Sequence, residues 1–368
     1  MPTNLTVSAL LDAQARLSEI IAGDTPSGYP KNVAKETARA LLREHNARVS
    51  PVLQGRPGST AQKFVGMRVY WLKTGSMALD YNGDGGVDFT PDCEVEAGAG
   101  SESDTTTYTN NLYMQKIVET EDDLSENLYE IEELVAERLL TARLSILQGL
   151  NTRMVNFLNS NKTGVNDDAE TIDGVNFNAG VFEIDPTIIN MREWQALTDL
   201  DAIMANNRIQ EWFYISGRHN FFNAVKDARY LRRDDDKRSE SAFDDYNMYF
   251  DQRALDSTLN GRFTFGVGRG TYVFWDRTDA PRTPIQVSDN AWEYFIEDPE
   301  IMLMDNGRMR PLRYNVRYQK ICTGVSKVSM RSTYRHVWEF TLFGGLYPAP
   351  ASESGNTGLL AFKSLVGG

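Results

Sequence analysis

The chain has 368 residues, 41% of them hydrophobic and 11% aromatic, which is enough apolar material for a large core and excludes wholesale disorder. The formal net charge of −13 excludes a surface built to grip nucleic-acid phosphates, because such surfaces cluster lysine and arginine. Cys93 and Cys322 are the only cysteines, which excludes a disulfide framework and fits a reducing compartment.

The N-terminal residues contain no basic segment followed by an apolar core, and no window of the chain holds eighteen apolar residues. We therefore expect a soluble protein that is made in the cytoplasm and does not contact a membrane.

The first 63 residues are interpreted as an arm. Apolar residues at helical spacing predict one helix over 6–21 and a second, shorter helix over 32–46. Glycine, proline and serine follow each helix and indicate flexible joints. The two helices have too little apolar surface to fold alone, so we expect them to lie on another surface.

A β pattern begins at Phe64. Strands are predicted over 65–73 and 108–120, and the segment between them is polar and rich in glycine. The simplest interpretation is a two-stranded ribbon that projects from the body. An isolated ribbon is only marginally stable, so this one should pack against a neighbour.

The longest predicted element is an amphipathic helix of roughly 35 residues, which would span about 50 Å and act as a strut across an extended molecule. Asp123 is a suitable N-cap with Glu126 three positions later, and Gly149 is a weak point that costs about 1 kcal/mol against alanine. The apolar stripe recurs at steps of three and four residues: Leu124, Leu128, Ile131, Val135, Leu139, Ala142, Ile146, Leu150, Met154 and Phe157.

A layered α/β lobe is predicted after the long helix. A helix over 191–206, a buried strand over 212–216 and a helix over 217–229 follow one another, which is typical of such a lobe. In the second helix, Phe221, Phe222 and Val225 are expected to face inward.

The last third of the chain is predicted to be mostly strand. Residues 263–265 and 271–275 flank the glycine-rich run 266–270 and are interpreted as a hairpin. Alternation of apolar and polar residues predicts two further strands with one wet face. Their apolar residues are Leu312, Tyr314, Val316 and Tyr318, followed by Trp338, Phe340 and Leu342.

The sharpest local motif is an acidic loop whose oxygen-bearing side chains are Asp80, Asn82, Asp84 and Asp88. Oxygens at alternate positions with a glycine at the sixth, here Gly85, are typical of a calcium-binding loop. The twelfth position is Pro91 where an EF-hand has glutamate, and no amphipathic helix flanks the loop. The motif therefore predicts either a calcium site or a plain turn at the tip of a hairpin.

No catalytic constellation is evident in the sequence. The run Gly266–Gly270 lies between strands and is one residue short of a dinucleotide fingerprint, so it predicts a turn. The histidines His45, His219 and His336 lack metal-ligand spacing and are expected to cap or pack. We expect no catalytic residue, no enzymatic activity, and no cofactor apart from the calcium that the acidic loop would hold.

The order of these segments is similar to that of a known family. The segments include KIVETEDDLSENLYEIEELVAERLLTARLSILQGLN at the entry to the long helix and EWFYISGRHNFFNAV in the lobe. Their order resembles that of the major capsid proteins of tailed bacteriophages, which have the Hong Kong 97-type fold. The resemblance implies an α+β fold with a long spine helix. Its implied parts are an N-terminal arm over 1–63, an extended β-hairpin E-loop over 64–120, a P-domain part with the spine helix over 121–185, an A-domain over 186–318, and a return to the P-domain with the C-terminal tail over 319–368.

The same resemblance implies a structural protein of the virion capsid. Hexamers and pentamers of it would form an icosahedral shell around packaged double-stranded phage DNA, with only non-specific proximity to that DNA. Scaffolding, portal and decoration proteins would be partners, and the bacterial host cytoplasm would be the place of synthesis. The acidic charge fits a container, because an interior that gripped DNA would hinder packaging and release.

The arm and the ribbon cannot bury their own apolar surface. Neighbouring subunits that cover this surface would explain both segments. We expect apolar patches on the arm and the long helix to drive association, with polar contacts of the E-loop adding register. The alternatives are a secreted calcium-binding adhesin or carbohydrate-binding module, an enzyme with a cleft of titratable groups, and another virion structural protein such as a tail protein.

Overall fold

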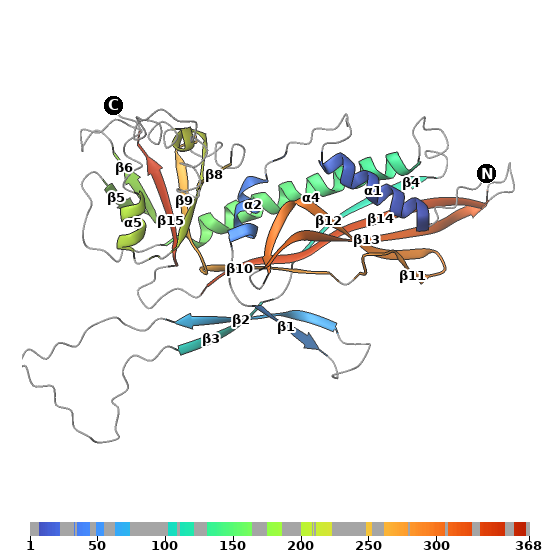
Figure 1. Cartoon of the computed structure of the whole chain (residues 1–368), viewed down its shortest axis with the longest axis horizontal. Helices are drawn as coiled ribbons and strands as arrows, with labels where there is room; N and C mark the ends of the chain where they lie inside the picture. Colours follow the sequence, from blue (N-terminus) through green and yellow to red (C-terminus); the bar gives the residue numbers. More distant parts are fainter. Residues whose placement is uncertain are drawn as a thin grey trace, which may run out of the picture.

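The structure is a computed structural model, and Figure 1 shows an elongated body, a smaller lobe at one end of it, and a separate ribbon of strands. The predicted α+β class is confirmed. No helix in the described ranges has both the length and the apolarity to cross a membrane. The structure describes residues 7–22, 33, 35–44, 49–54, 63–73, 102–108, 111–120, 131–163, 175–185, 200–207, 209, 211–222, 248–251, 261–278, 280–305, 308–325, 332–349 and 357–365.

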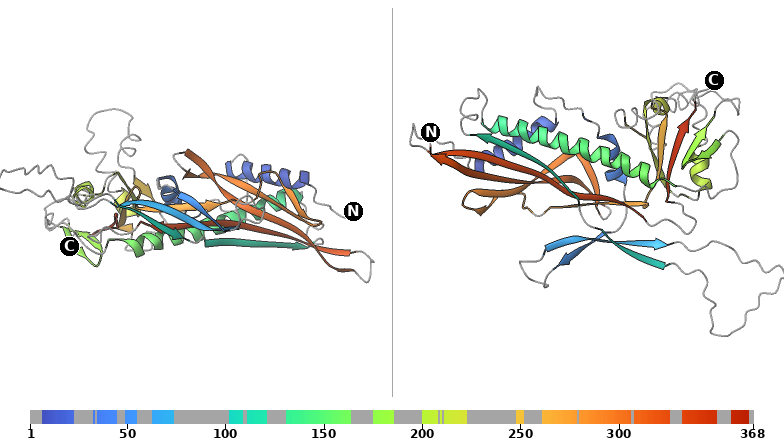
Figure 2. Two further views of the ribbon diagram at one scale, coloured as in Figure 1. Left: turned by 90° about the horizontal axis from the view of Figure 1, so that it is seen from below. Right: turned by 180° about the vertical axis from the view of Figure 1, so that it is seen from behind.

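The body is built on a long antiparallel sheet (Figure 2). In space the strands follow the order β10, β14, β13, β12 and β11, and β4 also pairs with β14. Trp338 of β14 lies opposite Tyr318 of β13 and Ile117 of β4, which sets the register across three strands. The strands are β4 (Asn111–Thr120), β10 (Tyr272–Arg277), β11 (Ile285–Ser288), β12 (Ala291–Asp305), β13 (Arg308–Val325) and β14 (Ser332–Pro348).

One face of this sheet, called here the inner face, carries the large side chains of the core. The predicted alternation in β13 and β14 is confirmed, because every apolar residue named for it is buried. Successive residues of a strand point to opposite faces, so these residues share one side. The buried residues are Leu312, Tyr314, Val316, Tyr318, Trp338, Phe340 and Leu342.

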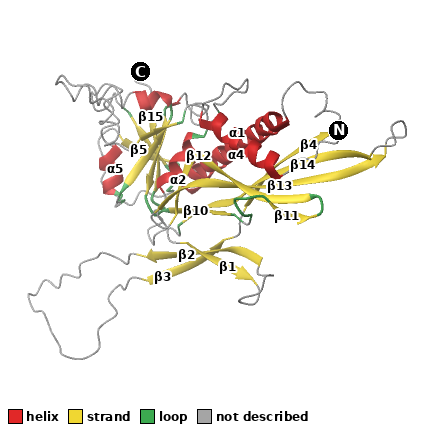
Figure 3. Ribbon diagram, turned by 45° about the vertical axis from the view of Figure 1, so that its right-hand side comes forward, coloured by secondary structure: helices red, strands yellow, loops and turns green. Residues whose placement is uncertain are grey.

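The long helix α4 (Ile131–Asn161) lies along the inner face (Figures 1 and 3). Its 31 residues span about 46 Å. The predicted stripe is confirmed from Val135 to Met154, but the helix also buries a second row: Ala136, Leu140, Arg143, Leu147, Asn151 and Leu158. The predicted cap at Asp123 and Glu126 lies outside the described residues.

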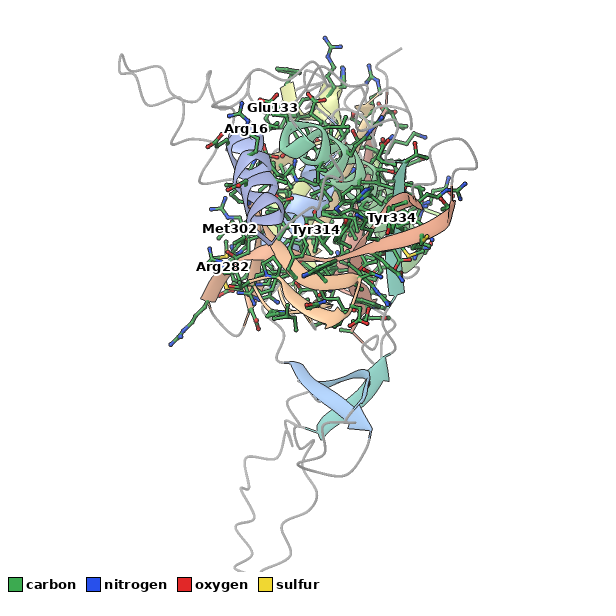
Figure 4. All side chains as sticks on the ribbon, turned by 90° about the vertical axis from the view of Figure 1, so that its right-hand side faces the viewer. Arg16, Glu133, Arg282, Met302, Tyr314 and Tyr334 are labelled. Atoms are coloured by element: carbon green, nitrogen blue, oxygen red, sulfur yellow. The ribbon has the colours of Figure 1, made fainter. Side chains whose placement is uncertain are left out.

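Two N-terminal helices cover this second row. The helices α1 (Val7–Ala22) and α2 (Glu36–Glu44) pack against α4 and β12, with Leu17 and Leu41 fully buried. Arg16 of α1 also donates a 2.8 Å hydrogen bond to Glu133 of α4, and Figure 4 shows the two side by side. The predicted arm does lie on another surface, but that surface belongs to its own chain.

The lobe contains a mixed six-stranded sheet in the order β5, β6, β15, β9, β7 and β8. The predicted helix over 191–206 is described only as α5 (Leu200–Asn206), and the buried strand over 212–216 is confirmed. Residues 218–222 are helical, but Phe222 is 48% exposed, so its inward placement was wrong; Val225 lies outside the described residues. The strands are β5 (Val175–Asn178), β6 (Val181–Ile184), β7 (Trp212–Ser216), β8 (Met248–Phe250), β9 (Phe263–Gly268) and β15 (Leu359–Ser364).

The predicted hairpin around residues 266–270 is wrong. β9 pairs with β7 and β15 in the lobe, whereas β10 pairs with β14 in the body, so the chain crosses between sheets here. A side chain on Gly268 would come within 2.7 Å of Ile209, and Gly270 has a φ of 80°, so both glycines are required for this crossing. Two strands joined by a short glycine turn pair in isolation, but here each finds a better partner in a different sheet.

The ribbon has three antiparallel strands where two were predicted. They are β1 (Val49–Gln54), β2 (Lys63–Lys73) and β3 (Glu102–Tyr108), with β2 in the centre. The predicted strand over 108–120 leaves the ribbon and becomes β4, an edge strand of the body sheet. The strand β1 comes from the segment interpreted as the arm.

β10 to β14, residues 272–348, all belong to the body sheet. The predicted domain boundaries stay a prediction. The last strand, β15, returns to the lobe and not to the body. These pairings join residues far apart in the sequence, so the local sequence pattern does not predict them.

The docking of α1 predicts a stability effect. Leu17→Ala should lower the free energy of unfolding by about 2–5 kcal/mol, because it leaves a cavity under a fully buried side chain. Leu11→Ala, at a position that is 40% exposed on the same helix, should change it by less than about 0.5 kcal/mol. Urea denaturation followed by circular dichroism compares the two. Equal, small effects would mean that α1 is not part of the core.

Candidate subunit interface

The ribbon β1–β2–β3 is the first part of the candidate interface. It lies on the side of the long sheet that faces away from α1 and α4 (Figures 1 and 4). A thin sheet of this kind needs a hydrophobic face packed against something to be stable in water. The ribbon therefore needs a surface to pack against.

The second part is the outer face of the long sheet, opposite α4, together with the edge strand β4. On β4, Tyr113 and Ile117 pack toward the core, and Gln115 donates a 2.9 Å hydrogen bond to Ser145 of α4. The residues between them point outward, and Met114 and Val118 are 50% and 47% exposed. Two half-exposed apolar side chains on an open edge are typical of a surface that another chain covers.

The outer face also carries an alternating row of charges across four strands. The cross-strand neighbours are Lys116, Glu339, Arg317 and Glu293, in that order. The outer pairs of this row are separated by 3.8 Å and 3.7 Å, and all four side chains are a third to a half exposed. Such exposed pairs each contribute about 0–1 kcal/mol, so they specify register more than they stabilise the fold.

An arginine stem shields apolar surface on this face. Arg313 forms a 3.2 Å ion pair with Glu297, and its guanidinium lies 4.8 Å from the centre of the Phe295 ring. Long basic side chains commonly cover apolar surface in this way while their charge stays in water. Other half-exposed apolar side chains of the body are Leu11, Ile285, Val287, Met309 and Ile321.

The expected role of the arm and long helix in association is not supported by their burial. The apolar rows of α4 and the inward faces of α1 and α2 lie in the core of their own chain. These faces are therefore already covered in a single subunit. The exposed apolar residues of the described chain lie mostly on the sheet, namely Met114, Val118, Ile285, Val287, Met309 and Ile321.

The buried charges of the body form a structural cluster. Arg143 of α4 donates to both carboxylate oxygens of Asp298 at 2.6 Å and 2.8 Å, and to Glu300 at 2.6 Å. Burial alone would lower the pKa of Arg143, but its bonds to Asp298 outweigh burial and raise it. Burial would raise the pKa of Glu300, but hydrogen bonds from Lys35 and Arg143 hold it below its usual value. Each of these groups is paired with another, so the cluster holds α4, β12 and the segment before α2 together.

The predicted calcium-loop residues Asp80, Asn82, Asp84 and Asp88 lie outside the described residues, so the calcium site stays a prediction. Within the described ranges, no three histidine, cysteine, aspartate or glutamate side chains converge on a common point that could hold a metal ion.

The glycine run 266–270 forms the crossing between sheets, and Cys322 is an exposed thiol.

The predicted packing role of histidine is confirmed for His336. Its ring is fully buried on the inner face, lies 2.8 Å through Nδ1 from the Tyr318 hydroxyl, and stacks beside Trp338. Its Nε2 has no hydrogen-bond partner among the described residues. Burial lowers the pKa of His336 to about 4, with Lys320 contributing in the same direction. His45 lies outside the described residues, and His219 is half-buried in the lobe.

Solved structures of phage capsids are similar to this chain. The capsid of cyanophage P-SCSP1u is 9% identical, covers 93% of this chain and 92% of its own, and has a TM-score of 0.42. The capsid asymmetric unit of cyanophage Pam1 is 10% identical, with 92% and 96% covered and a TM-score of 0.45. The capsid of a native GTA particle is 11% identical, with 93% and 95% covered and a TM-score of 0.36. No protein-family model and no curated protein sequence matches the chain.

The buried histidine predicts a pH effect. Unfolded His336 titrates near 6.5 and folded His336 near 4, so the unfolded state binds more protons between these values. Stability should fall as the pH drops from 6.5 toward 4. The variant His336→Phe should lose less stability over this range, because it lacks the group whose pKa burial lowers. Urea midpoints at pH 7, 6 and 5 measure this difference, and parallel pH profiles would contradict it.

Proposed function

We propose that this chain is a structural subunit, the major capsid protein of a tailed bacteriophage with the Hong Kong 97-type fold. Copies of it would assemble into hexamers and pentamers and form an icosahedral shell around packaged double-stranded DNA. The observation that carries the proposal is the ribbon β1–β2–β3, which projects beside an elongated body that a long helix stiffens (Figure 1). A thin sheet of this kind needs a surface to pack against, which a neighbouring copy would supply.

This geometry favours a neighbouring copy of the chain as the surface against which the ribbon packs. The ribbon and the outer face of the long sheet lie on the same side of the molecule (Figure 4). Met114, Val118 and Ile321 are exposed on that sheet, and the charge row beside them would fix the position of a partner. Apolar anchors among polar pairs are the usual composition of an interface between subunits. Each copy would then lay its ribbon over its neighbour.

The charge of the chain supports the same proposal. The formal net charge is −13, and the buried Arg143 and the partly buried Arg310 are paired with carboxylates of their own chain. A shell with this negative charge would enclose DNA without binding it tightly, which allows the DNA to be packaged and released. The proposed location is therefore the virion capsid, after synthesis in the bacterial cytoplasm.

Scaffolding, portal and decoration proteins are the proposed partners beside the chain itself. A shell of identical subunits needs a vertex through which DNA enters, and an assembly aid where the subunits alone do not close correctly. These partners would meet surfaces left free after the ribbon contacts have formed. Co-expression with candidate scaffolding genes from the same genome is the direct way to find them.

Assembly of the purified chain tests the proposal. Negative-stain microscopy and light scattering after size-exclusion chromatography should detect hexamers, pentamers or hollow shells, alone or with a scaffold. A chain that stays monomeric under every condition, with and without a scaffold, would contradict the proposed function.

A point substitution tests the outer face as the interface. Val118→Lys should reduce assembly at least tenfold, because a lysine charge replaces an apolar contact, yet leave the folding free energy within about 0.5 kcal/mol. Val118→Thr keeps the branched shape and should assemble nearly as the unsubstituted chain does. Assembled fraction by sedimentation velocity and stability by urea denaturation separate the two effects. Full assembly of Val118→Lys would show that this part of the face is not an interface.

A further inference from the structure

The helix α2 lies where the lobe meets the body (Figure 1). It packs against α4 and β12 of the body and against β8 of the lobe. Both of its ends are held by side chains from these two parts. A nine-residue helix is too short to be stable by itself, so its position depends on those contacts.

The first turn of α2 is held by a buried carboxylate and a buried amide. Asp251, just after β8, accepts hydrogen bonds from the Thr37 amide at 3.2 Å and the Thr37 hydroxyl at 2.5 Å. It also accepts one at 3.0 Å from the side-chain amide of Asn151 of α4, whose oxygen accepts from the Ala38 amide at 2.9 Å. The Asp251 amide itself donates to Ser216 of β7. One carboxylate thus joins α2, the lobe and α4.

The last turn of α2 is held by Glu44. Tyr249 of β8 donates a 2.5 Å hydrogen bond to this carboxylate, and Arg269 donates one at 2.6 Å. Burial, together with the bond to Glu44, raises the pKa of Tyr249 well above its usual value, so the hydroxyl keeps the proton that it donates. On the body side, Tyr272 donates a 2.8 Å hydrogen bond to the Leu41 carbonyl.

In the described chain, the backbone connections between lobe and body gather at one crossing point, and apolar side chains of β7, β9 and β15 also pack in the same cluster as α2, α4 and the body sheet. The chain passes there three times, and backbone hydrogen bonds join the passes to one another. They run from the Thr163 amide to Leu359 at 2.8 Å, from the Gly268 amide to Gly358 at 3.0 Å, and from the Ala349 amide to Thr271 at 2.8 Å. A single bundle of crossings has the geometry of a hinge, because it permits rotation about one point. Asp251 and its partners join the lobe to the body away from these crossings, whereas Arg269, which holds Glu44, lies within them.

We infer that α2 is a latch, and that its contacts through Asp251 and Glu44 fix the angle between the lobe and the body. With the latch closed, the two parts move as one unit. With α2 released, the lobe turns about the crossing point while the inner-face core of the body stays packed. The inference depends on these contacts alone, and it holds or fails independently of the proposed function.

Distance measurements between spin labels test the latch on the purified, unassembled full-length chain. The labels are placed at Gln148→Cys on α4 and Asn178→Cys on β5, both exposed, in a chain with Cys93→Ser and Cys322→Ser. Asp251→Ala removes the buried acceptor, and Glu44→Gln weakens the other end with little change of shape. The matched control is Glu183→Gln, which removes a 3.1 Å ion pair with Lys363 inside the lobe.

Both latch variants should broaden or shift the distance distribution, and amide exchange of residues 36–44 should become at least about tenfold faster. The control should leave both readouts unchanged, and the amides of β13 and β14 should stay protected in every variant. Faster exchange of α2 with an unchanged label distance would overturn the inference, as would unchanged exchange of α2 in both latch variants. If Asp251→Ala unfolds the whole chain, the label distance and the amide exchange of α2 in Glu44→Gln test the inference by the same criteria.

Discussion

The packing of α4 against the inner face of the long sheet is the contact on which the rest of the molecule depends. A sheet with one apolar face must bury that face, and a helix of about 46 Å covers most of the length that β12, β13 and β14 offer. Because α4 itself is apolar on two rows, α1 and α2 are recruited to cover its second row. The helices therefore all lie on one side, and the other face of the sheet is left to water or to a partner.

Charge follows the same division between an inner and an outer side. On the inner side, Arg143 and Asp298 are fully buried, and each satisfies the other through two hydrogen bonds. Removing one partner of such a pair costs about 3–5 kcal/mol, because the other charge remains buried alone. On the outer face the pairs are long and exposed, and they stabilise little. The inner charges thus hold this chain together, whereas the outer charges stay exposed to solvent.

The three parts of the molecule differ in how they obtain their stability. The larger core lies in the body and reaches into the lobe through β7, β9 and β15, and the lobe has a second, smaller core around Phe182, Met204 and Phe362. The ribbon is a thin sheet on the open side of the body (Figures 2 and 4). A shell subunit has the same needs: a stiff centre to keep its shape, and extensions that gain stability only from neighbours. This match between stability and position favours an assembling protein over a self-contained enzyme or binding module.

The sequence by itself determined the elements that have strong local patterns. The long helix, the alternation in β13 and β14 and the buried strand 212–216 were all predicted, because the period of apolar side chains reports local structure directly. Arg143 and Asn151 lie in the buried apolar surface of α4. Polar residues at such positions indicate buried hydrogen-bond partners.

Only the tertiary structure decided which strands pair and what covers each helix. β9 and β10 share a short glycine-rich connection but join different sheets, and β4 leaves the ribbon for the body. The arm helices bury themselves on α4, and α2 is fixed by Asp251, more than 200 residues away. The physical reason is the same in each case: pairing and burial are settled by contacts between distant segments, whose free energy exceeds any local preference and leaves no periodic trace in the sequence.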